Sequence, residues 1–184
     1  MTYPLIPFAA PSGEAEALAE NRVSGSVDRR GNSLAVGFHL RDTASLDIPP
    51  PAVVPERRHE LWRATCFEVF LARPGESGYR EVNLSPAGHW NIYRFIGYRQ
   101  GMEEERAVAA LPFQVVARAG VLTLDVVIDL TALGLKEAAI EVGLSAVLLE
   151  RTGRVTYHAL AHPGAAEGQP DFHRREGFRL HLPP

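Results

Sequence analysis

Glycine and proline recur along the whole chain and divide it into short segments, and this feature most limits how the chain can fold. The 184 residues include 16 glycines and 14 prolines, and both residue types disfavour the interior of regular elements. Most segments between them alternate apolar and polar residues with a period of two, which is typical of strands with one buried face. The pattern therefore predicts an all-β domain.

The predicted strands are short and are separated by turn residues such as those at 74–76, 85–88, 119–120 and 152–153. They cover residues 22–28, 33–40, 61–72, 79–84, 91–95, 113–117, 121–130, 141–149, 155–161 and 178–182. About ten short strands with almost no helix predict an antiparallel β-sandwich or barrel.

The rest of the chain is predicted to be irregular or, in two places, helical. Residues 12–20 are rich in Glu and Ala, and residues 129–138 have room for one or two helical turns. Four prolines make residues 46–58 a loop, and the run from Glu103 to Arg106 is read as a solvated loop or helix start. The length suits a single domain over residues 1–184, with an irregular N-terminal segment at 1–21.

Composition excludes several classes of protein. The 19 basic and 22 acidic residues give a net charge of −3, so a nucleic-acid partner is not expected. A single cysteine, Cys66, rules out an internal disulfide framework and a Cys-rich zinc site. There is no apolar run of membrane-spanning length and no visible signal peptide, so the expected location is the cytoplasm, without a membrane partner.

The segment from Trp62 to Met102 carries the most specific pattern. Alternation places one set of apolar side chains on a core face, namely Phe67, Val69, Leu71, Val82, Leu84 and Ile92. The opposite face then carries a polar and aromatic platform, namely Trp62, Glu68, Glu81, Asn83, Asn91 and Tyr93. Such a face fits saccharide binding, although an ordinary solvated sheet face has a similar composition.

The two carboxylates of this face are expected to be neighbours. If the hairpins fold symmetrically about Gly75 and Ala87, Glu68 lies near Glu81, Glu81 near Tyr93, and Asn83 near Asn91. Facing carboxylates repel unless a cation or hydrogen-bond donor lies between them. Arg63, Arg94, Arg99 or a ligand would be able to supply it.

Several strings of the sequence resemble a bacterial DOMON-like family. They are residues 61–71 (LWRATCFEVFL), 79–95 (YREVNLSPAGHWNIYRF), 97–102 (GYRQGM), 157–164 (YHALAHPG), 170–173 (PDFH) and 177–178 (GF). That family is similar to the family 9 carbohydrate-binding modules, and the resemblance implies an immunoglobulin-like β-sandwich. In those modules a Trp six residues before a strand Glu contributes to the sugar site, and Trp62 with Glu68 has this spacing. Their second stacking Trp has no counterpart, because the only other Trp is Trp90.

The expected function is therefore non-catalytic binding of a carbohydrate or a cell-wall sugar derivative, without a cofactor. Trp62 would stack on the ligand, Glu68 and Glu81 would accept hydroxyl hydrogen bonds, and other residues of the platform would complete the site. The predicted ligand-binding residues are Trp62, Glu68, Glu81, Asn83, Asn91, Tyr93 and Arg94. A protein-interaction module that uses the same face is an alternative, and a homodimer is left open.

Three other chemistries are less favoured. The DOMON resemblance implies haem as an alternative, with Met102 and either His158 or His162 as ligands. A metal site at His158, His162, Asp171 and His173 is disfavoured, because positions four apart on a strand lie about 13 Å apart. We expect His162, Asp171 and His173 to hold the 163–170 loop by side-chain-to-backbone hydrogen bonds instead. A glycosidase using Glu68 and Glu81 is disfavoured because a flat sheet face offers no cleft.

Overall fold

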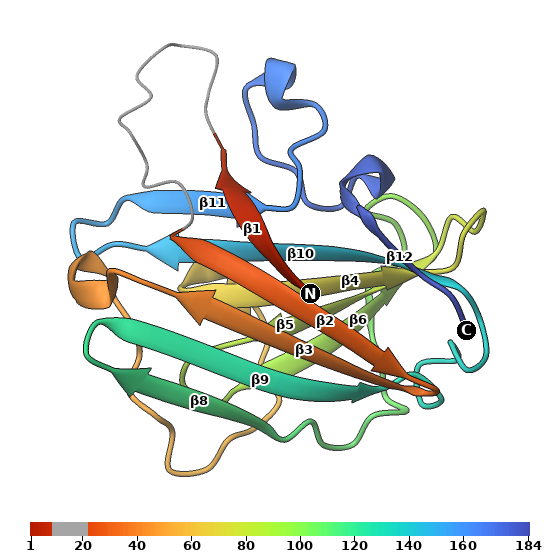
Figure 1. Cartoon of the computed structure of the whole chain (residues 1–184), viewed down its shortest axis with the longest axis horizontal. Helices are drawn as coiled ribbons and strands as arrows, with labels where there is room; N and C mark the ends of the chain where they lie inside the picture. The colour runs from red at the N-terminus through yellow and green to blue at the C-terminus, as the bar shows by residue number, and fades with distance from the viewer. Residues whose placement is uncertain (9–21) are drawn as a thin grey trace.

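The computed structural model describes residues 1–8 and 22–184, which form an all-antiparallel β-sandwich (Figure 1). The strands are β1 (Thr2–Pro7), β2 (Val23–Arg30), β3 (Ser33–Leu40), β4 (Cys66–Ala72), β5 (Tyr79–Leu84), β6 (Trp90–Phe95), β7 (Glu103–Glu104), β8 (Phe113–Arg118), β9 (Val121–Asp129), β10 (Ile140–Leu149), β11 (Val155–Ala159) and β12 (Leu180–Leu182). Short 3₁₀ turns complete the described part, namely η1 (Thr43–Ser45), η2 (Leu61–Arg63), η3 (Ala165–Glu167) and η4 (Arg175–Gly177).

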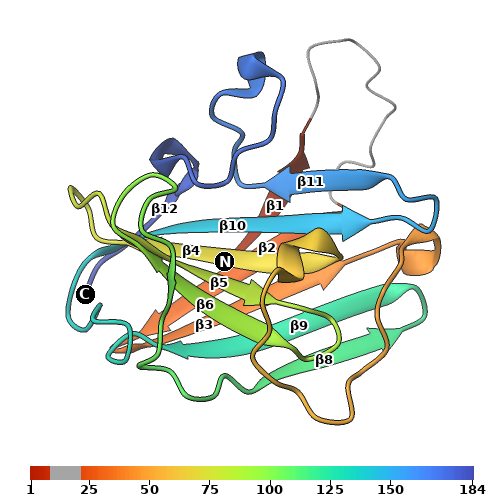
Figure 2. The ribbon, with the colours of Figure 1, turned by 180° about the vertical axis from the view of Figure 1, so that it is seen from behind.

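The strands form two layers that β1 connects. The first sheet has the order β1-β2-β3-β9-β8, and the second has the order β7-β6-β5-β4-β10-β11, with β12 also paired to β10. The first part of β1 pairs with β2, and its last two residues, Ile6 and Pro7, pair with β11. The sheet therefore continues from one layer into the other, which gives the curled appearance of Figures 1 and 2.

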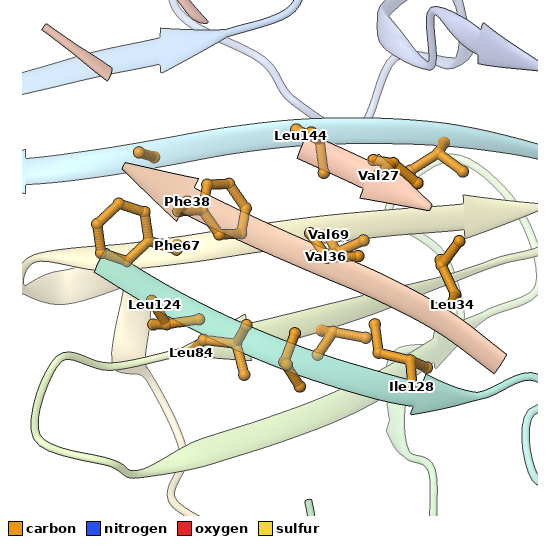
Figure 3. Packing of buried hydrophobic residues seen from close by; sticks show 14 of the residues in the cluster. Val27, Leu34, Val36, Phe38, Phe67, Val69, Leu84, Leu124, Ile128 and Leu144 are labelled. Carbon is orange, nitrogen blue, oxygen red and sulfur yellow. The ribbon is translucent and has the colours of Figure 1, made fainter. Parts of the chain in front are cut away.

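The main core lies between the two sheets. Alternate residues of the first sheet, such as Leu34, Val36 and Phe38, are buried while their neighbours are more exposed. They face Phe67 and Val69 of β4, and the rings of Phe38 and Phe67 lie 5.0 Å apart (Figure 3). All six residues predicted for the core face of the second sheet belong to this cluster.

The outer face of the second sheet is also buried, and a second apolar cluster lies there. Its fully buried members are Phe70, Ala72, Tyr79, Tyr93, Phe95 and Phe178, with Trp62 and Phe172 packed against them. Phe178 comes from the C-terminal segment that precedes β12, and Figure 2 shows that segment beside the strands of the second sheet. Every residue of β4 is consequently buried.

Gly143 of β10 makes room for this packing. A Cβ at this position would lie 2.9 Å from a ring carbon of Phe178 and 3.3 Å from the Cβ of Phe70. The absence of a side chain here allows the Phe178 ring to approach the strand closely.

Most predicted strands are present, and the all-β sandwich is confirmed. The N-terminal segment was expected to be irregular, but its first residues form β1 because they pair with both layers. Residues 129–138 form turns after β9 rather than a helix, and the start of the 61–72 strand is instead the turn η2. The 103–106 run contributes the short edge strand β7. The predicted helix at 12–20 lies outside the described residues.

The register of the β5–β6 hairpin is as predicted, with Glu81 opposite Tyr93 and Asn83 opposite Asn91. In the β4–β5 hairpin, Glu68 and Glu81 lie near each other on one face as predicted, but they are not directly paired: Glu68 lies opposite Asn83, and Glu81 lies opposite Phe70. The loop that joins these strands spans residues 73–78, and its centre is not Gly75. A shift of two residues leaves every side chain on its predicted face, because the side-chain period of a strand is two.

A search of the described residues for a helix long and apolar enough to cross a membrane finds none.

Candidate functional site

A cavity of about 330 Å³ lies on the outer face of the second sheet. Its floor consists of side chains from four neighbouring strands, namely Glu68 of β4, Glu81 of β5, Val147 of β10 and Tyr157 of β11. Val147 lies opposite Tyr157, and Glu68 lies opposite Ser145, two residues before Val147. Because directly paired residues point to the same side of a sheet, these side chains meet on one face.

The walls of the cavity come from three separate parts of the chain. One wall consists of Trp62 from η2, and a second contains Phe95 with Arg99 and Met102 from the turn after β6. The third wall comes from the C-terminal segment and contains Pro170, Phe172 and His173. The cavity therefore combines an acidic floor with aromatic walls, and its volume is at the lower end of the range for small-molecule sites.

Glu68 and Glu81 are almost completely withdrawn from solvent, with exposed fractions of 4% each. Ser145 donates a hydrogen bond to Oε2 of Glu68 at 2.9 Å, and Asn83 donates one to Oε1 of Glu81 at 2.7 Å. Burial, reinforced by the charge of Glu81, raises the pKa of Glu68 to about 8. Burial also raises the pKa of Glu81 to about 7. The pair therefore holds protons near neutral pH that ordinary carboxyl groups have already lost.

Arg99 is the cation that faces the two carboxyl groups. Its charge lowers the pKa of both Glu68 and Glu81 and so opposes the effect of their burial. Its guanidinium also forms an ion pair with Asp171 of the C-terminal segment, at 3.0 Å. Tyr98 donates a second hydrogen bond to the same carboxylate. The ion pair joins the turn after β6 to the opposite wall of the cavity.

His173 is held in the wall by Tyr79, whose hydroxyl lies 2.7 Å from Nδ1 of the imidazole. The same hydroxyl accepts a hydrogen bond from the backbone N–H of Arg99, so it can donate its own proton to Nδ1. Burial and the nearby charge of Arg99 lower the pKa of His173 to about 4. The imidazole is therefore neutral at pH 7, and its Nε2 lies 3.8 Å from Oε2 of Glu81.

Trp62 lines the cavity as predicted, but it is not part of a strand. It lies in η2, which follows Glu60 in the left-handed region at φ 57°. Its ring packs edge-on against Tyr93, with the ring centres 5.7 Å apart. Tyr93 thus supports Trp62 from below rather than lining the cavity itself.

Asn83 and Asn91 are on the predicted face but act within the protein. Asn83 donates to Glu81 and accepts a weak hydrogen bond from the thiol of Cys66 at 3.6 Å. Asn91 accepts a hydrogen bond from Arg57 at 2.6 Å and donates one to the hydroxyl of Tyr93 at 2.9 Å. Neither amide is among the lining residues of the cavity.

Arg94 lies outside the cavity, contrary to its predicted role. It alternates with Tyr93 and Phe95 along β6, points to the other side, and pairs with Glu103. Arg63 pairs with Glu60 at 2.7 Å. Of the three arginines considered for the carboxylate pair, Arg99 is therefore the one that the fold brings to it.

The outer face is a cavity and not the flat platform that the alternation suggested. The C-terminal segment and the turn at residues 97–102 contact each other through Asp171 and Arg99, and both contribute walls around the two carboxyl groups. A protein-interaction module that uses this face is not tested by this geometry and stays a prediction. The argument against a glycosidase that relied on a flat surface is wrong.

The residues proposed as haem ligands do not come together. Met102 lines the cavity, but His158 is paired with Ala146 and points to the core side of the sheet, away from Tyr157. His162 Nε2 lies 2.7 Å from the backbone oxygen of Ile6, and its ring packs on Phe8. Within the described part of the chain, His, Cys, Asp and Glu form no group of three that could hold a metal ion. The backbone N–H of His173 donates to Asp171 at 3.1 Å, next to the 163–170 loop, whereas the side chain of His162 makes its hydrogen bond to Ile6 of β1 and not to the loop.

Sequence reasoning missed most of the cavity walls. Phe95 lies two residues after Tyr93 on β6, and therefore on the same face, but it was not proposed as a site residue. The other residues that were not proposed for the sugar site come from distant strands or loops, namely Val147, Tyr157, Pro170, Phe172 and His173, while Arg99 was considered only as a partner for the carboxyl pair. Most of these lie in the strings that carried the family resemblance, which was the available signal.

Comparisons with known proteins extend the description of the fold. Neither a scan against protein-family models nor a search of curated proteins finds a match, and the DOMON resemblance stays a prediction. One similar solved structure is a "putative carbohydrate-binding protein" from Bacteroides uniformis, with a TM-score of 0.66 and 14% identity. The similarity covers 96% of this chain and 83% of that one. The two proteins therefore share a fold.

Two further solved structures have lower scores. Both are family 9 carbohydrate-binding modules from Caldicellulosiruptor kristjanssonii, one in complex with glucose and one with cellotriose. Their TM-scores are 0.48 and 0.47, each at 11% identity over 80% of this chain, covering 71% and 69% of those chains.

Proposed function

We propose that the cavity on the second sheet binds a small carbohydrate without transforming it. The observation that carries the proposal is the combination of an acidic floor, formed by Glu68 and Glu81, with aromatic walls in one cavity. Aromatic rings pack against the apolar C–H faces of a sugar ring. Carboxyl groups and a guanidinium bind hydroxyl groups in pairs.

The cavity offers each type of contact on a different side. Trp62 and Phe172 present rings from opposite walls, while Glu68, Glu81 and Arg99 present polar groups between them. A volume of about 330 Å³ suits one or two sugar rings rather than a long polymer. The shared fold with a protein from Bacteroides uniformis that carries a carbohydrate-binding name is a further support.

A glycoside hydrolase is the second candidate, because one observation favours it. Two buried carboxyl groups with pKa values of about 8 and 7 include a protonated acid at neutral pH, as glycosidases require. Incubation with chromogenic aryl glycosides distinguishes the two functions. Release of the aryl group that Glu68→Gln abolishes would support hydrolysis, whereas binding without release supports the non-catalytic function.

Substitution of Trp62 tests the proposed function directly. We expect Trp62→Ala to weaken binding of mono- and disaccharides at least about fivefold, because a stacking ring of this size contributes about 1 kcal/mol or more. Trp62→Phe keeps an aromatic face and should stay within a few-fold of the wild type. Calorimetric titration of a saccharide panel, selected first by thermal shift, measures both effects.

Arg94→Ala is the matched control for this experiment. The sequence pattern includes Arg94 in the site, whereas the structure places it outside the cavity and paired with Glu103. We therefore expect Arg94→Ala to bind sugar as the wild type does. Binding that survives Trp62→Ala unchanged, or a panel in which no saccharide binds, would contradict the proposed function.

A further inference from the structure

The floor of the cavity has unused hydrogen-bond acceptors. Oε2 of Glu68 accepts a hydrogen bond from Ser145, and Oε1 of Glu81 accepts one from Asn83. Among the described residues, no donor forms a hydrogen bond with Oε1 of Glu68 or with Oε2 of Glu81. Each carboxyl group is therefore fixed by one oxygen and keeps the other available, although both side chains are at least nine-tenths buried.

The surrounding charges do not compensate this pair fully. Arg99 is the cationic residue in the lining, and it is already paired with Asp171 at 3.0 Å. Asp171 also accepts from Tyr98 and lies 3.4 Å from Arg174, so it belongs to a network on the cavity wall. His173, the other basic group of the lining, is neutral because its pKa is about 4. The floor consequently has room for one more positive charge.

The aromatic walls favour the same kind of ligand. Trp62, Phe95, Tyr157 and Phe172 line the cavity around the two carboxyl groups. The faces of aromatic rings attract cations, and such cages of rings are a recurring means of binding ammonium groups. A carboxyl pair beneath a cage of rings is a better match for an ammonium group than for a neutral hydroxyl group.

We infer that the ligand of this cavity is an amino sugar, whose protonated amino group lies between Glu68 and Glu81. The inference rests on the proposed function and adds the charge of the ligand to it. The ammonium group donates hydrogen bonds to the two available oxygens, and its positive charge favours the ionised form of the two carboxyl groups, which release their protons as it binds. Its sugar ring packs against Trp62.

Calorimetric titration at pH 6.5 with three sugars tests the inference. The probes are glucosamine, which is protonated at this pH, and the neutral sugars glucose and N-acetylglucosamine. We expect glucosamine to bind at least about tenfold more tightly than either neutral sugar, because hydrogen bonds between charged groups are about twice as strong as neutral ones. Neutral sugars that bind as tightly as glucosamine would overturn the inference and leave the proposed function intact.

Proton release gives a second measure that a purely steric preference would not produce. The groups facing the cavity that carry or can acquire charge are Glu68, Glu81, Arg99, His173 and Tyr157. Of these, the two glutamates have pKa values of about 8 and 7 and so hold protons at pH 6.5. Binding of a cation should expel protons from them, which titrations in buffers of different ionisation enthalpy detect. Glucose should release none, and an equal release by both sugars would overturn the inference.

Charge-neutral variants complete the test. In Glu81→Gln and Glu68→Gln, the preference for glucosamine over glucose should fall below about threefold, because one negative charge is lost while the side-chain shape is kept. Glu103→Gln, on the exposed ion pair with Arg94, should keep the wild-type preference. A preference that persists in both floor variants would overturn the inference.

Titration with methylammonium, which has the ammonium group but no sugar ring, distinguishes the contributions of the two groups to binding. If methylammonium binds while none of the three sugars binds, the proposed function and the amino-sugar assignment both fail. If glucosamine binds at least about tenfold more tightly than methylammonium, the sugar ring contributes, as both proposals require.

Discussion

Raising the pH from 6.5 to 8.5 is expected to lower the melting temperature of the ligand-free protein by roughly 5 °C or more. The reason is the pKa of Glu68 and Glu81, at about 8 and 7 in the folded state against an ordinary value of 4.5. The folded protein holds these protons, whereas the unfolded chain has released them above pH 4.5. Their contribution to stability is therefore complete below pH 4.5 and is lost as the pH rises through 7 and 8.

Between pH 6.5 and 8.5 the effect of the two glutamates on stability is separated from that of the buried histidines. Burial lowers the pKa of His158 and His173 to about 4, so these residues reduce stability only below about pH 6.5, where the unfolded chain takes up protons. The pKa of Cys66 is raised well above 9 by burial, and the thiol therefore ionises beyond the window.

The measurement is differential scanning calorimetry in steps of pH, on the wild type and on Glu81→Gln. The variant lacks one titrating group and should show a flatter decline between pH 6.5 and 8.5. Glu103→Gln serves as the control, because this exposed carboxylate has a lowered pKa through its hydrogen bond with Arg94. A wild-type melting temperature that is constant or rises across the window would contradict the prediction.

Phe178→Ala is expected to destabilise the protein by about 3 kcal/mol and to release the C-terminal wall of the cavity. The ring is 3% exposed and lies 5.4 Å from the ring of Phe70 and 5.9 Å from that of Tyr79. The guanidinium of Arg175 covers the ring from the other side, at 5.0 Å. Loss of this anchor removes the packing that fixes His173, only a few residues earlier in the chain.

Denaturant unfolding measures the loss of stability, and limited trypsin digestion at Arg174 and Arg175 measures the release of the segment. Phe38→Ala is the matched control, because Phe38 is 2% exposed and lies in the main core between the sheets. It should lower stability by a similar amount without faster cleavage at these arginines under native conditions. Equal cleavage rates in the two variants would contradict the anchoring role of Phe178.

The alternation of apolar and polar residues correctly predicted which side chains lie on each face of the second sheet. Phe67, Val69 and Ile92 lie in the core, while Glu68 and Glu81 lie on the opposite face, as predicted. Glu68 and Glu81 are neighbours as predicted, but their strands pair two positions away from direct opposition, because the sequence does not show where the 73–78 loop closes. The faces were nevertheless correct, since an even shift leaves the orientation of each side chain unchanged.

Prediction failed where a side chain depends on a loop or a distant segment. Alternation does not extend to the turn after β6, where the φ of Arg99 is 52°, so the sequence offered Arg99 only as one of three candidate partners for the carboxyl pair and the structure selects it. Trp62 reaches the cavity from η2 and not from the predicted strand. Arg94 was expected to complete the polar contacts of the site, but it follows Tyr93 on β6, and neighbours on a strand point in opposite directions.

The sequence alone determined the all-β class and the placement of two glutamates on one face of a sheet. These are consequences of a two-residue period, which acts over a few neighbouring positions. Only the tertiary structure decided that this face is a cavity, because the covering segment is about one hundred residues further along the chain. Packing of Phe178 on Phe70 and the Arg99–Asp171 ion pair hold that segment in place. Burial by these contacts raises the pKa of both carboxyl groups, a property that the sequence pattern does not reveal.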